Sequence, residues 1–549
     1  MPNLPLDPVA TLRQVTTLAR GADVLRRRGL LNPLRPDEAL RSVLNVSKFG
    51  PFAGVVMHAA HRTPSAPAIV DELGTLTYGE LDRLSNAYAR GLAAHGLQPG
   101  SVVALLARDH RGMVLSLVAA GKLGVRAVLM NTGFAKPQFA DVAARENVKA
   151  VLLDSEFIDL LDAIPDDVPR IFTWIDAKDG VAADAASVDS LIAGQSTDPV
   201  PAPPKPGGMV LLTSGTTGTP KGAPRDKVSP LQSAQFLDRV PLPRNGTMVM
   251  AAPCFHGTGL SQFTIGMALG NKMVLQQRRF DPEQTVANIA THRADALVVV
   301  PTMLQRIVDL PRDVLGKYDT SSLKVIFAAG SALSPDLTKR TAQTFGDVLY
   351  NLYGSTEVAV ASVATPADLR RFPDTVGKPP VGCKVAIYDE QRTLVTEPGV
   401  VGTIFVSSGL SFTGYTDGRN KEIVDGMMSS GDVGHFNTDG FLFVDGRDDD
   451  MIVSGGENVF PQEVENLLAE RPDVFEAAVI GVDDRDFGKR LRAFVVRAPE
   501  SDLDEDTVKQ YVKENLARYK VPREVVFIAE LPRNATGKLL RRNLIEMEI

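Results

Sequence analysis

Short runs of aliphatic and β-branched residues alternate with segments of helical character through most of this chain, and this alternation limits the folds that it can adopt. Such runs are typical of buried strands, and strands separated by helices form parallel sheets. A first series lies at residues 102–108, 125–130 and 149–154. A second series lies at residues 248–253, 272–276, 296–301, 324–330 and 348–354. We therefore expect an α/β protein with two βα-layered sheets.

The pattern changes in the last third of the chain. Residues 375–444 contain short strands separated by glycine turns, which indicates a small β subdomain. In the last hundred residues, helical segments flank apolar strands, which indicates a compact α+β unit. With 549 residues, several packing units are expected. We predict a helical extension over 1–45, a large domain over 46–445 and a small, mobile α+β domain over 446–549.

Composition narrows the class of protein. A net charge of −7 argues against a nucleic-acid partner. The two cysteines, Cys254 and Cys383, are too few for a disulfide framework or a cysteine zinc cluster, and they fit a reducing compartment. No stretch approaches the roughly 18 apolar residues that span a membrane, and the first residues lack the apolar core of a signal peptide. We expect a cytoplasmic protein.

The predicted N-terminal extension has two interpretations. Leu12, Val15, Leu18 and Leu25 recur at helical spacing, next to the basic cluster at 26–28. An apolar stripe of this kind is typical of a helix packed on the body of a protein. Combined with the arginines, it also suits a helix lying on the inner face of a membrane as a peripheral contact.

Residues 77–96 predict a well-defined helix. Thr77 and Glu80 have the spacing of a capping box, in which each residue binds the backbone N–H of the other. Leu81, Leu84 and Leu92 follow along one face, and Gly96 is placed to end the helix.

The stretch TSGTTGTPKG at 213–222 is dense in hydroxyl side chains and glycines. Glycines allow the backbone to approach a ligand closely, so that successive N–H groups converge on phosphate oxygens. Lys221 adds a positive charge. The Walker A pattern requires glycine before the lysine and serine or threonine after it, whereas Pro220 and Gly222 stand here. A flexible polar connector is the alternative interpretation.

YGSTE at 353–357 directly follows a predicted strand, and open α/β folds bind ligands at this edge of a sheet. Glu357 could ligate Mg²⁺, Thr356 could contact a phosphate and Tyr353 could stack on a base. A turn with a solvated glutamate is the alternative.

Three further residues are candidates for a nucleotide site. Asp432 in SGDVG and Arg447 in GRDDDMI are expected in turns and suit ribose hydroxyls. Lys538 follows a glycine-containing turn close to the last residue of the chain, where a mobile cation could enter and leave a site. The alternatives are an Asx-turn for Asp432, a surface charge run for Arg447 and a solvated lysine at 538.

Taken in order, these segments resemble the adenylate-forming superfamily of acyl-CoA synthetases, luciferases and peptide-synthetase adenylation domains, and bacterial fatty acid–CoA ligases in particular. The resemblance covers about residues 50–549. Its motifs are LTYGEL at 76–81, TSGTTGTPKG at 213–222, PCFHGTG at 253–259, AAGSALS at 328–334, YGSTE at 353–357, SGDVG at 430–434, GRDDDMIVSGGENVFPQEVE at 446–465 and PRNATGK at 532–538.

The resemblance implies a ligase that uses ATP, Mg²⁺ and coenzyme A through an acyl-AMP intermediate, with Lys538, Glu357 and His256 as catalytic residues and Glu357 as the magnesium ligand. Tyr353, Gly354 and Thr356 would contact the adenine and the α-phosphate, and Asp432 and Arg447 the ribose. The residues implied to bind the β and γ phosphates are Thr213, Ser214, Gly215, Thr216, Thr217, Gly218 and Lys221.

For the second half of the reaction, the resemblance implies a rotation of the small domain about a hinge at Asp449. Ser454, Gly455 and Gly456 would then line the tunnel for the pantetheine arm of CoA. His256, Gly330 and Ser331 would form the acyl pocket, where the missing side chain of Gly330 leaves room for the acid.

The resemblance to bacterial fatty-acid ligases favours a medium- or long-chain fatty acid as the substrate, with CoA as the acceptor. Two alternatives within the family are a fatty acyl-AMP ligase that delivers to a carrier protein and a CoA ligase for an aryl or branched acid. An alternative of a different class is a nucleotide-binding scaffold without catalysis. One departure from the family pattern is GMMSSGD at 426–432, where tryptophan and threonine are common; Ser430 retains the hydroxyl.

Overall fold

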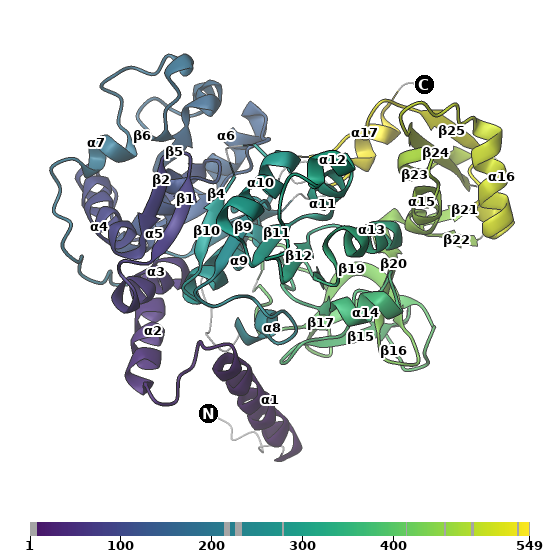
Figure 1. Ribbon diagram of the computed structural model, residues 1–549, viewed down its shortest axis with the longest axis horizontal. Coiled ribbons are helices and arrows are strands. Elements are labelled where there is room, and N and C mark those ends of the chain that lie inside the picture. Colours follow the sequence, from purple (N-terminus) through teal and green to yellow (C-terminus); the bar gives the residue numbers. More distant parts are fainter. Residues whose placement is uncertain are drawn as a thin grey trace.

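The computed structural model describes residues 8–213, 220–225, 233–276, 279–412, 414–454, 457–484, 488–534 and 537–547. It has a large N-terminal part built on three sheets and a small C-terminal part built on one (Figure 1). The predicted α/β class is therefore confirmed, including the β subdomain and the separate α+β unit.

The first of the two layered sheets has six strands, of which all but the last are parallel. Their order is β6 (Arg170–Trp174), β5 (Ala150–Asp154), β3 (Val102–Leu106), β4 (Arg126–Leu129), β7 (Met209–Thr213) and β8 (Lys221–Pro224). The second has eight strands, antiparallel only at its two margins. Their order is β14 (Ser362–Ala364), β13 (Leu349–Tyr353), β12 (Val325–Ala329), β11 (Ala296–Val299), β9 (Thr247–Met250), β10 (Lys272–Leu275), β1 (Pro67–Asp71) and β2 (Gly74–Thr77).

The β subdomain is antiparallel, and the C-terminal sheet is antiparallel apart from its last pair of strands. The subdomain contains β15 (Lys384–Tyr388), β16 (Leu394–Val395), β17 (Gly402–Ser407), β18 (Ile423–Val424), β19 (Met427–Phe436) and β20 (Leu442–Arg447). The C-terminal sheet contains β21 (Ile452–Ser454), β22 (Glu457–Val459), β23 (Val474–Asp484), β24 (Gly488–Arg497) and β25 (Glu524–Phe527), with α15 (Pro461–Ala469), α16 (Glu505–Asn515) and α17 (Arg541–Ile545).

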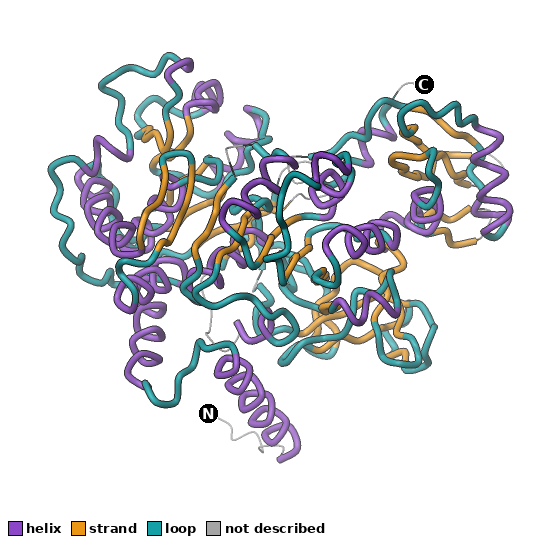
Figure 2. Tube along the Cα trace, in the orientation of Figure 1, coloured by secondary structure: helices purple, strands orange, loops and turns teal. Residues whose placement is uncertain are grey.

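Helices cover the faces of the layered sheets, as the distribution of helix and strand in Figure 2 shows. They include α3 (Pro51–Arg62), α4 (Tyr78–Ala94), α5 (Arg111–Leu123), α6 (Lys136–Arg145), α7 (Val188–Ile192), α8 (Ser233–Leu237), α9 (Gly257–Ala268), α10 (Pro282–His292), α11 (Pro301–Val308), α12 (Arg312–Leu315), α13 (Pro335–Phe345) and α14 (Pro366–Arg371). They are preceded by α1 (Pro8–Arg27) and α2 (Pro36–Phe49). No helix in the described ranges is long and apolar enough to cross a bilayer.

Local sequence signals account for α4 directly. The Thr77 hydroxyl accepts the N–H of Glu80 at 3.2 Å, and the Glu80 carboxylate accepts the N–H of Thr77 at 2.8 Å. The predicted capping box is therefore confirmed, and Gly96 follows the end of the helix with a φ of 88°.

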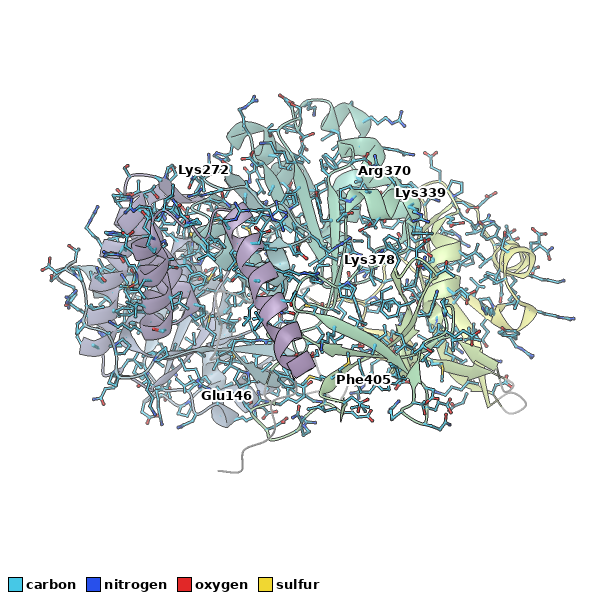
Figure 3. The ribbon with its side chains drawn as sticks, turned by 90° about the horizontal axis from the view of Figure 1, so that it is seen from below. Glu146, Lys272, Lys339, Arg370, Lys378 and Phe405 are labelled. Atoms are coloured by element: carbon cyan, nitrogen blue, oxygen red, sulfur yellow. The ribbon has the colours of Figure 1, made fainter. Side chains whose placement is uncertain are left out.

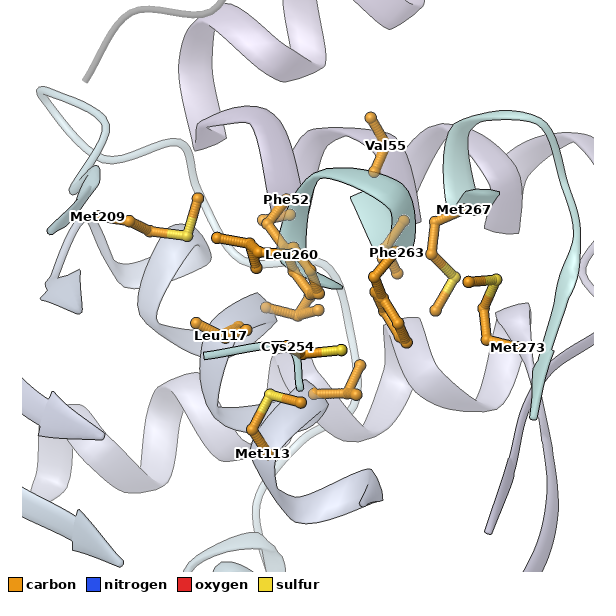
Figure 4. Close-up of a cluster of buried hydrophobic side chains, with 14 of the residues drawn as sticks. Phe52, Val55, Met113, Leu117, Met209, Cys254, Leu260, Phe263, Met267 and Met273 are labelled. Atoms are coloured by element: carbon orange, nitrogen blue, oxygen red, sulfur yellow. The ribbon is translucent and has the colours of Figure 1, made fainter. Parts of the chain in front are cut away.

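The main core joins α3 and α9 between the two layered sheets. The rings of Phe52 and Phe263 stack with their centroids 5.6 Å apart, and Leu260 and Met267 extend the cluster along α9 (Figure 4). All four side chains are buried, so packing rather than helix propensity fixes the position of α9.

One buried cation joins α4 to α5. The Lys122 ammonium donates to Asp82, Ser85 and Asn86 at 2.7–2.8 Å, and its side chain is completely inaccessible. Burial lowers the pKa of Lys122 to about 8, although Asp82 opposes this shift. The charge is tolerated because all three donor positions are used.

We expect Lys122→Ala to lower the free energy of unfolding by about 3–5 kcal/mol, because the buried acceptors lose their donor. The matched control is Lys324→Ala, whose ammonium is paired with Asp295 but is largely exposed. Denaturant unfolding monitored by fluorescence measures both variants. Equal shifts of the unfolding midpoints of the two variants would contradict a stabilising role for the buried Lys122 ammonium.

Candidate functional site

The ends of the glycine-rich segment are held together by strand pairing. Thr213, the last residue of β7, lies opposite Lys221, the first residue of β8. A side chain at Gly222 would come within 2.5 Å of Thr416 Oγ1 and 2.8 Å of Glu146 Oε1, so a larger residue here would displace these side chains. The side chain of Thr213 and the whole of Ser214, Gly215, Thr216, Thr217 and Gly218 lie outside the described residues.

A tight turn after β13 presents Glu357. The Ser355 hydroxyl accepts the N–H groups of Glu357 and Val358 at 3.2 and 3.3 Å. A side chain at Gly354 would overlap the carbonyl of Ala359, which itself has a φ of 62°. The turn therefore depends on glycine at its start, and Thr356 is partly buried within it.

Glu357 lies in a cluster of charged and aromatic side chains. The Tyr415 hydroxyl donates to Glu357 Oε1 at 2.6 Å, and the Lys221 ammonium lies 5.0 Å from the centre of the Tyr415 ring. Burial and the Glu357 contact raise the pKa of Tyr415 above its usual value. Burial lowers the pKa of Arg225, and the Glu357 charge opposes this shift. The structure thus brings together two residues that the sequence predicted, Lys221 and Glu357.

The chemistry of this cluster fits a magnesium–phosphate complex. Mg²⁺ is commonly held by one or two carboxylates together with phosphate oxygens. Among the described residues, no group of three or more histidine, cysteine or acidic side chains could hold a metal without a ligand. Glu357 supplies one carboxylate, which could ligate a Mg²⁺ ion whose other ligands are phosphate oxygens and water, and Lys221, which lies over the Tyr415 ring, supplies a positive charge for the phosphates.

Asp432 and Arg447 were expected in turns, and this prediction is wrong. Both lie in paired strands, β19 and β20, where they are direct neighbours across the sheet. Gly431 has a φ of 82° inside β19, where the pairing with β17 shifts register. The positive φ that glycine allows is therefore used at an irregularity of the strand rather than in a turn. The Ser430 hydroxyl accepts the Asp432 N–H at 3.1 Å and donates to the Ile404 carbonyl at 3.0 Å.

The same strands place Asp432 beside Tyr353. The Tyr353 hydroxyl donates to Asp432 Oδ2 at 2.6 Å, and Arg447 Nη1 lies 3.7 Å from Asp432 Oδ1. Burial, followed by the charge of Asp432, raises the pKa of Tyr353 well above its usual value. An aromatic ring, a carboxylate and a guanidinium therefore converge at the end of β13, and together they can bind a nucleoside.

His256 lies at the entrance to α9, where it is the N-terminal capping position. Its Nε2 atom is buried and has no hydrogen-bond partner among the described residues. Burial lowers the pKa of His256 to about 4, so the ring is neutral at pH 7. A neutral ring at this position can donate or accept a hydrogen bond but cannot form an ion pair with a carboxylate.

Gly330 marks a wall near the start of α9. It is exposed, with a φ of 103°, and a side chain there would lie 3.4 Å from Thr258 Oγ1 and 3.5 Å from Val300 Cγ1. The neighbouring Ser331 is partly buried. This wall belongs to the ends of β11 and β12 and the first turn of α9, and it carries no charge.

The segment with Lys538 reaches the large domain beside this wall. Gly537 has a φ of 76° and lies so close to Thr302 that a side chain would overlap the threonine hydroxyl. Thr302 is two residues after Val300, at the start of α11. The Lys538 N–H donates to Asn534 Oδ1 at 2.9 Å, and its side chain is exposed.

The predicted hinge and CoA residues are only partly described. Asp449 lies in a short 3₁₀ turn (Asp448–Asp450) between β20 and β21, and its side chain is outside the described part. Ser454 ends β21, again without a described side chain. Gly455 and Gly456 lie outside the described residues.

Asp109, which the sequence analysis did not single out, contacts the segment that leads to His256. Its two carboxylate oxygens accept the Cys254 N–H at 3.0 and 3.1 Å, and Cys254 is two residues before His256. Burial raises the pKa of Asp109 to about 6, and only weaker effects of Cys254, His110 and Arg108 oppose the shift. Tyr415 and Arg225 were also missed, because no local pattern links them to Glu357.

Comparison with known proteins identifies the family to which this chain belongs. Residues 56–416 match the AMP-binding enzyme family, and residues 463–538 match the AMP-binding enzyme C-terminal domain. The indoleacetate–CoA ligase of Aromatoleum aromaticum is 33% identical over 86% of this chain and 93% of its own length. The fatty acid–acyl-carrier-protein ligase ScoC of Streptomyces coeruleorubidus is 31% identical over 89% and 94%.

A solved structure extends the similarity to three dimensions. The o-succinylbenzoate CoA synthetase of Bacillus subtilis, in complex with its acyl-adenylate intermediate, superposes with a TM-score of 0.76. Its sequence is 27% identical, and the match covers 90% of this chain and 98% of that structure.

We expect Asp109→Asn to raise the melting temperature at pH 8 and to leave it nearly unchanged at pH 3. The folded-state pKa of about 6 exceeds the unfolded value of 3.8, so the stability of the wild type is complete below pH 3.8 and falls as the pH rises from 3.8 to about 6. The amide removes this loss, which is about 3 kcal/mol, and retains one acceptor for Cys254. The control is Asp502→Asn at an exposed position. A lower melting temperature of Asp109→Asn at pH 8 would contradict the burial of a charge here.

Proposed function

Because the chain belongs to the AMP-binding enzyme family and is an AMP-forming acid–CoA ligase, we propose that its substrate is a hydrophobic monocarboxylic acid. The reaction uses ATP, Mg²⁺ and CoA. We place it in the cytoplasm, where both ATP and CoA are available.

The proposed reaction has two displacements. In the first, a carboxylate oxygen attacks the α-phosphorus of ATP, the bond to the β-phosphate oxygen breaks, and pyrophosphate leaves. In the second, the CoA sulfur attacks the acyl carbon, the bond to the phosphate oxygen breaks, AMP leaves and the thiol proton passes to water. Both steps redistribute negative charge, so catalysis depends on positioned donors and cations.

The contacts around β13 and β19 support the nucleotide assignments. Tyr353 and Asp432 would hold the adenosine, with Arg447 beside the ribose. Gly354 and Thr356 would face the α-phosphate from the turn after β13. Mg²⁺, when bound at Glu357, would neutralise phosphate charge. Lys221, which lies over the ring of the tyrosine that donates to Glu357, would bind the same phosphates.

The position of Gly537 supports the assignment of Lys538 as the catalytic lysine of the first step. Its contact with Thr302 brings the segment to the acyl wall at Val300 and Gly330. In the second step, we propose that the small domain turns about Asp449, so that Lys538 leaves and Ser454, Gly455 and Gly456 approach for the pantetheine arm.

The proposal that the substrate is a monocarboxylic acid rests on the absence of charge from the described side chains of the acyl wall. His256 is uncharged at pH 7, and Thr258, Val300 and Gly330 supply no charge. A second carboxylate on the substrate would therefore lie at this wall without a counter-charge. The wall suits an acid with one carboxylate and an apolar remainder.

An aryl group is the first candidate for the apolar part of the substrate. The similarity to an indoleacetate–CoA ligase favours the aryl alternative over the medium- or long-chain fatty acid that the sequence predicted. A fatty acid is the second candidate, since a fatty acid–acyl-carrier-protein ligase is similar over nearly the same length. That relative also keeps a carrier protein as an alternative acceptor.

A first experiment separates the ligase from a nucleotide-binding scaffold. We expect the wild type to catalyse acid-dependent ATP–pyrophosphate exchange and Lys538→Ala to lose at least about 10²-fold, because a cation at the developing charge is removed. The control is Lys513→Ala on α16. Exchange that is absent with every acid, or equal in the two variants, would favour the scaffold.

A second experiment identifies the acid and the acceptor. We expect thioester formation with CoA to be fastest for an arylacetic acid such as indoleacetate, slower for octanoate and palmitate, and slowest for 2-succinylbenzoate. Mass spectrometry of the products measures the series. Faster turnover of palmitate would establish the fatty acid candidate, and accumulation of acyl-AMP without thioester would point to a carrier protein.

A further inference from the structure

Exposed apolar side chains are concentrated on the two N-terminal helices. In the described part of the chain, sixteen large hydrophobic side chains are recorded as exposed, and six of them precede residue 50. These six are Val15, Leu18, Leu34, Leu40, Val43 and Leu44, and we call their surface the N-terminal apolar face. A concentration of this kind on an otherwise well-packed protein marks a binding surface.

The first helix has an apolar stripe that the rest of the protein covers only in part. Val24 and Leu25 are buried, and Arg28 anchors the end of α1 by donating to the Leu237 carbonyl of α8 at 2.9 Å. About two to three turns earlier, Val15 and Leu18 are more than half exposed, at 56% and 51%. Figure 3, seen from below, shows α1 in front of the body on that side. The packed interpretation therefore holds for the second half of α1, whereas the first half leaves part of the apolar stripe exposed.

The orientation of α2 is fixed by close packing on α3. A side chain at Gly54 would come within 2.6 Å of the backbone of Val46, so that side of α2 is pressed against α3. Leu40, Val43 and Leu44 have the i, i+3, i+4 spacing of one helix face, which points away from α3. Leu34, in the connection from α1, is the most exposed of the six at 88%.

Positive charge surrounds this face. Residues 8–49 contain eight lysines and arginines and three acidic residues, although the whole chain has a net charge of −7. Asp23 pairs with Arg26 and Arg27, and Arg35 pairs with both Asp37 and Glu38. Arg20, Arg41 and Lys48 are exposed and form no ion pair with a described carboxylate. The segment therefore has a charge opposite to that of the rest of the protein.

We propose that the N-terminal apolar face docks on the surface of a membrane that contains anionic lipids. Exposed leucines and valines would enter the boundary between headgroups and acyl chains, while the flanking arginines and lysine would bind the headgroups. A second copy of the chain is a poorer occupant, because two like-charged surfaces would face each other. This docking does not depend on which acid the enzyme activates.

The test uses the full-length protein and sedimentation with vesicles. The wild type is expected to sediment with phosphatidylcholine vesicles that contain phosphatidylglycerol, and to be released as salt is raised. The double variant Leu18→Glu, Leu40→Glu is expected to lose at least about tenfold in binding. Arg20→Ala and Arg41→Ala are each expected to weaken it about fivefold.

The matched control is Leu73→Glu, an equally exposed leucine in the turn between β1 and β2. It is expected to bind like the wild type, and exchange activity reports that each variant is folded. Binding retained by the double variant, absent from anionic vesicles, or lost equally in Leu73→Glu would overturn the proposal. A concentration-dependent dimer that only the double variant abolishes would assign the face to a second copy instead.

Discussion

The hydrogen bonds that the Asp109 carboxylate accepts from the Cys254 backbone connect the two layered sheets, and the position of the site depends on this connection. Asp109 follows β3 of the six-stranded sheet, whereas Cys254 follows β9 of the eight-stranded sheet. The two sheets also meet through apolar packing between α3, α5 and α9, which has no directional preference, and through the ion pair of Arg111 on α5 with Asp71 at the end of β1. The Asp109 carboxylate adds a directional contact at the edge where His256 and α9 begin, and it does so at a cost in stability.

Contacts between charged and polar side chains also fix the two clusters that we assign to the nucleotide, around Glu357 and around Asp432. The Glu357 carboxylate accepts a hydrogen bond from the Tyr415 hydroxyl and interacts with the charge of Arg225, while the Lys221 ammonium lies over the Tyr415 ring. Tyr353 and Arg447 surround Asp432 in the same manner. Arrangements of this kind are prepared for an anionic ligand before it arrives, which reduces the reorganisation that binding requires.

The sequence predicted features that depend on neighbouring residues and missed those that depend on distant ones. The strands and the capping box of α4 follow from local periodicity and spacing, and they were predicted correctly. SGDVG was misread because a glycine with positive φ can serve a strand irregularity as well as a turn. Tyr415 lies 58 residues from Glu357, and Asp109 lies 145 residues from Cys254, so only the tertiary fold pairs them.

The contact between Gly537 and Thr302 has a consequence for timing. No side chain fits between Gly537 and Thr302, so the segment with Lys538 approaches the start of α11 closely. Under the domain rotation that we propose, this contact must separate before Ser454, Gly455 and Gly456 can approach. Glycine at position 537 would then matter for the first step of the reaction and not for the second.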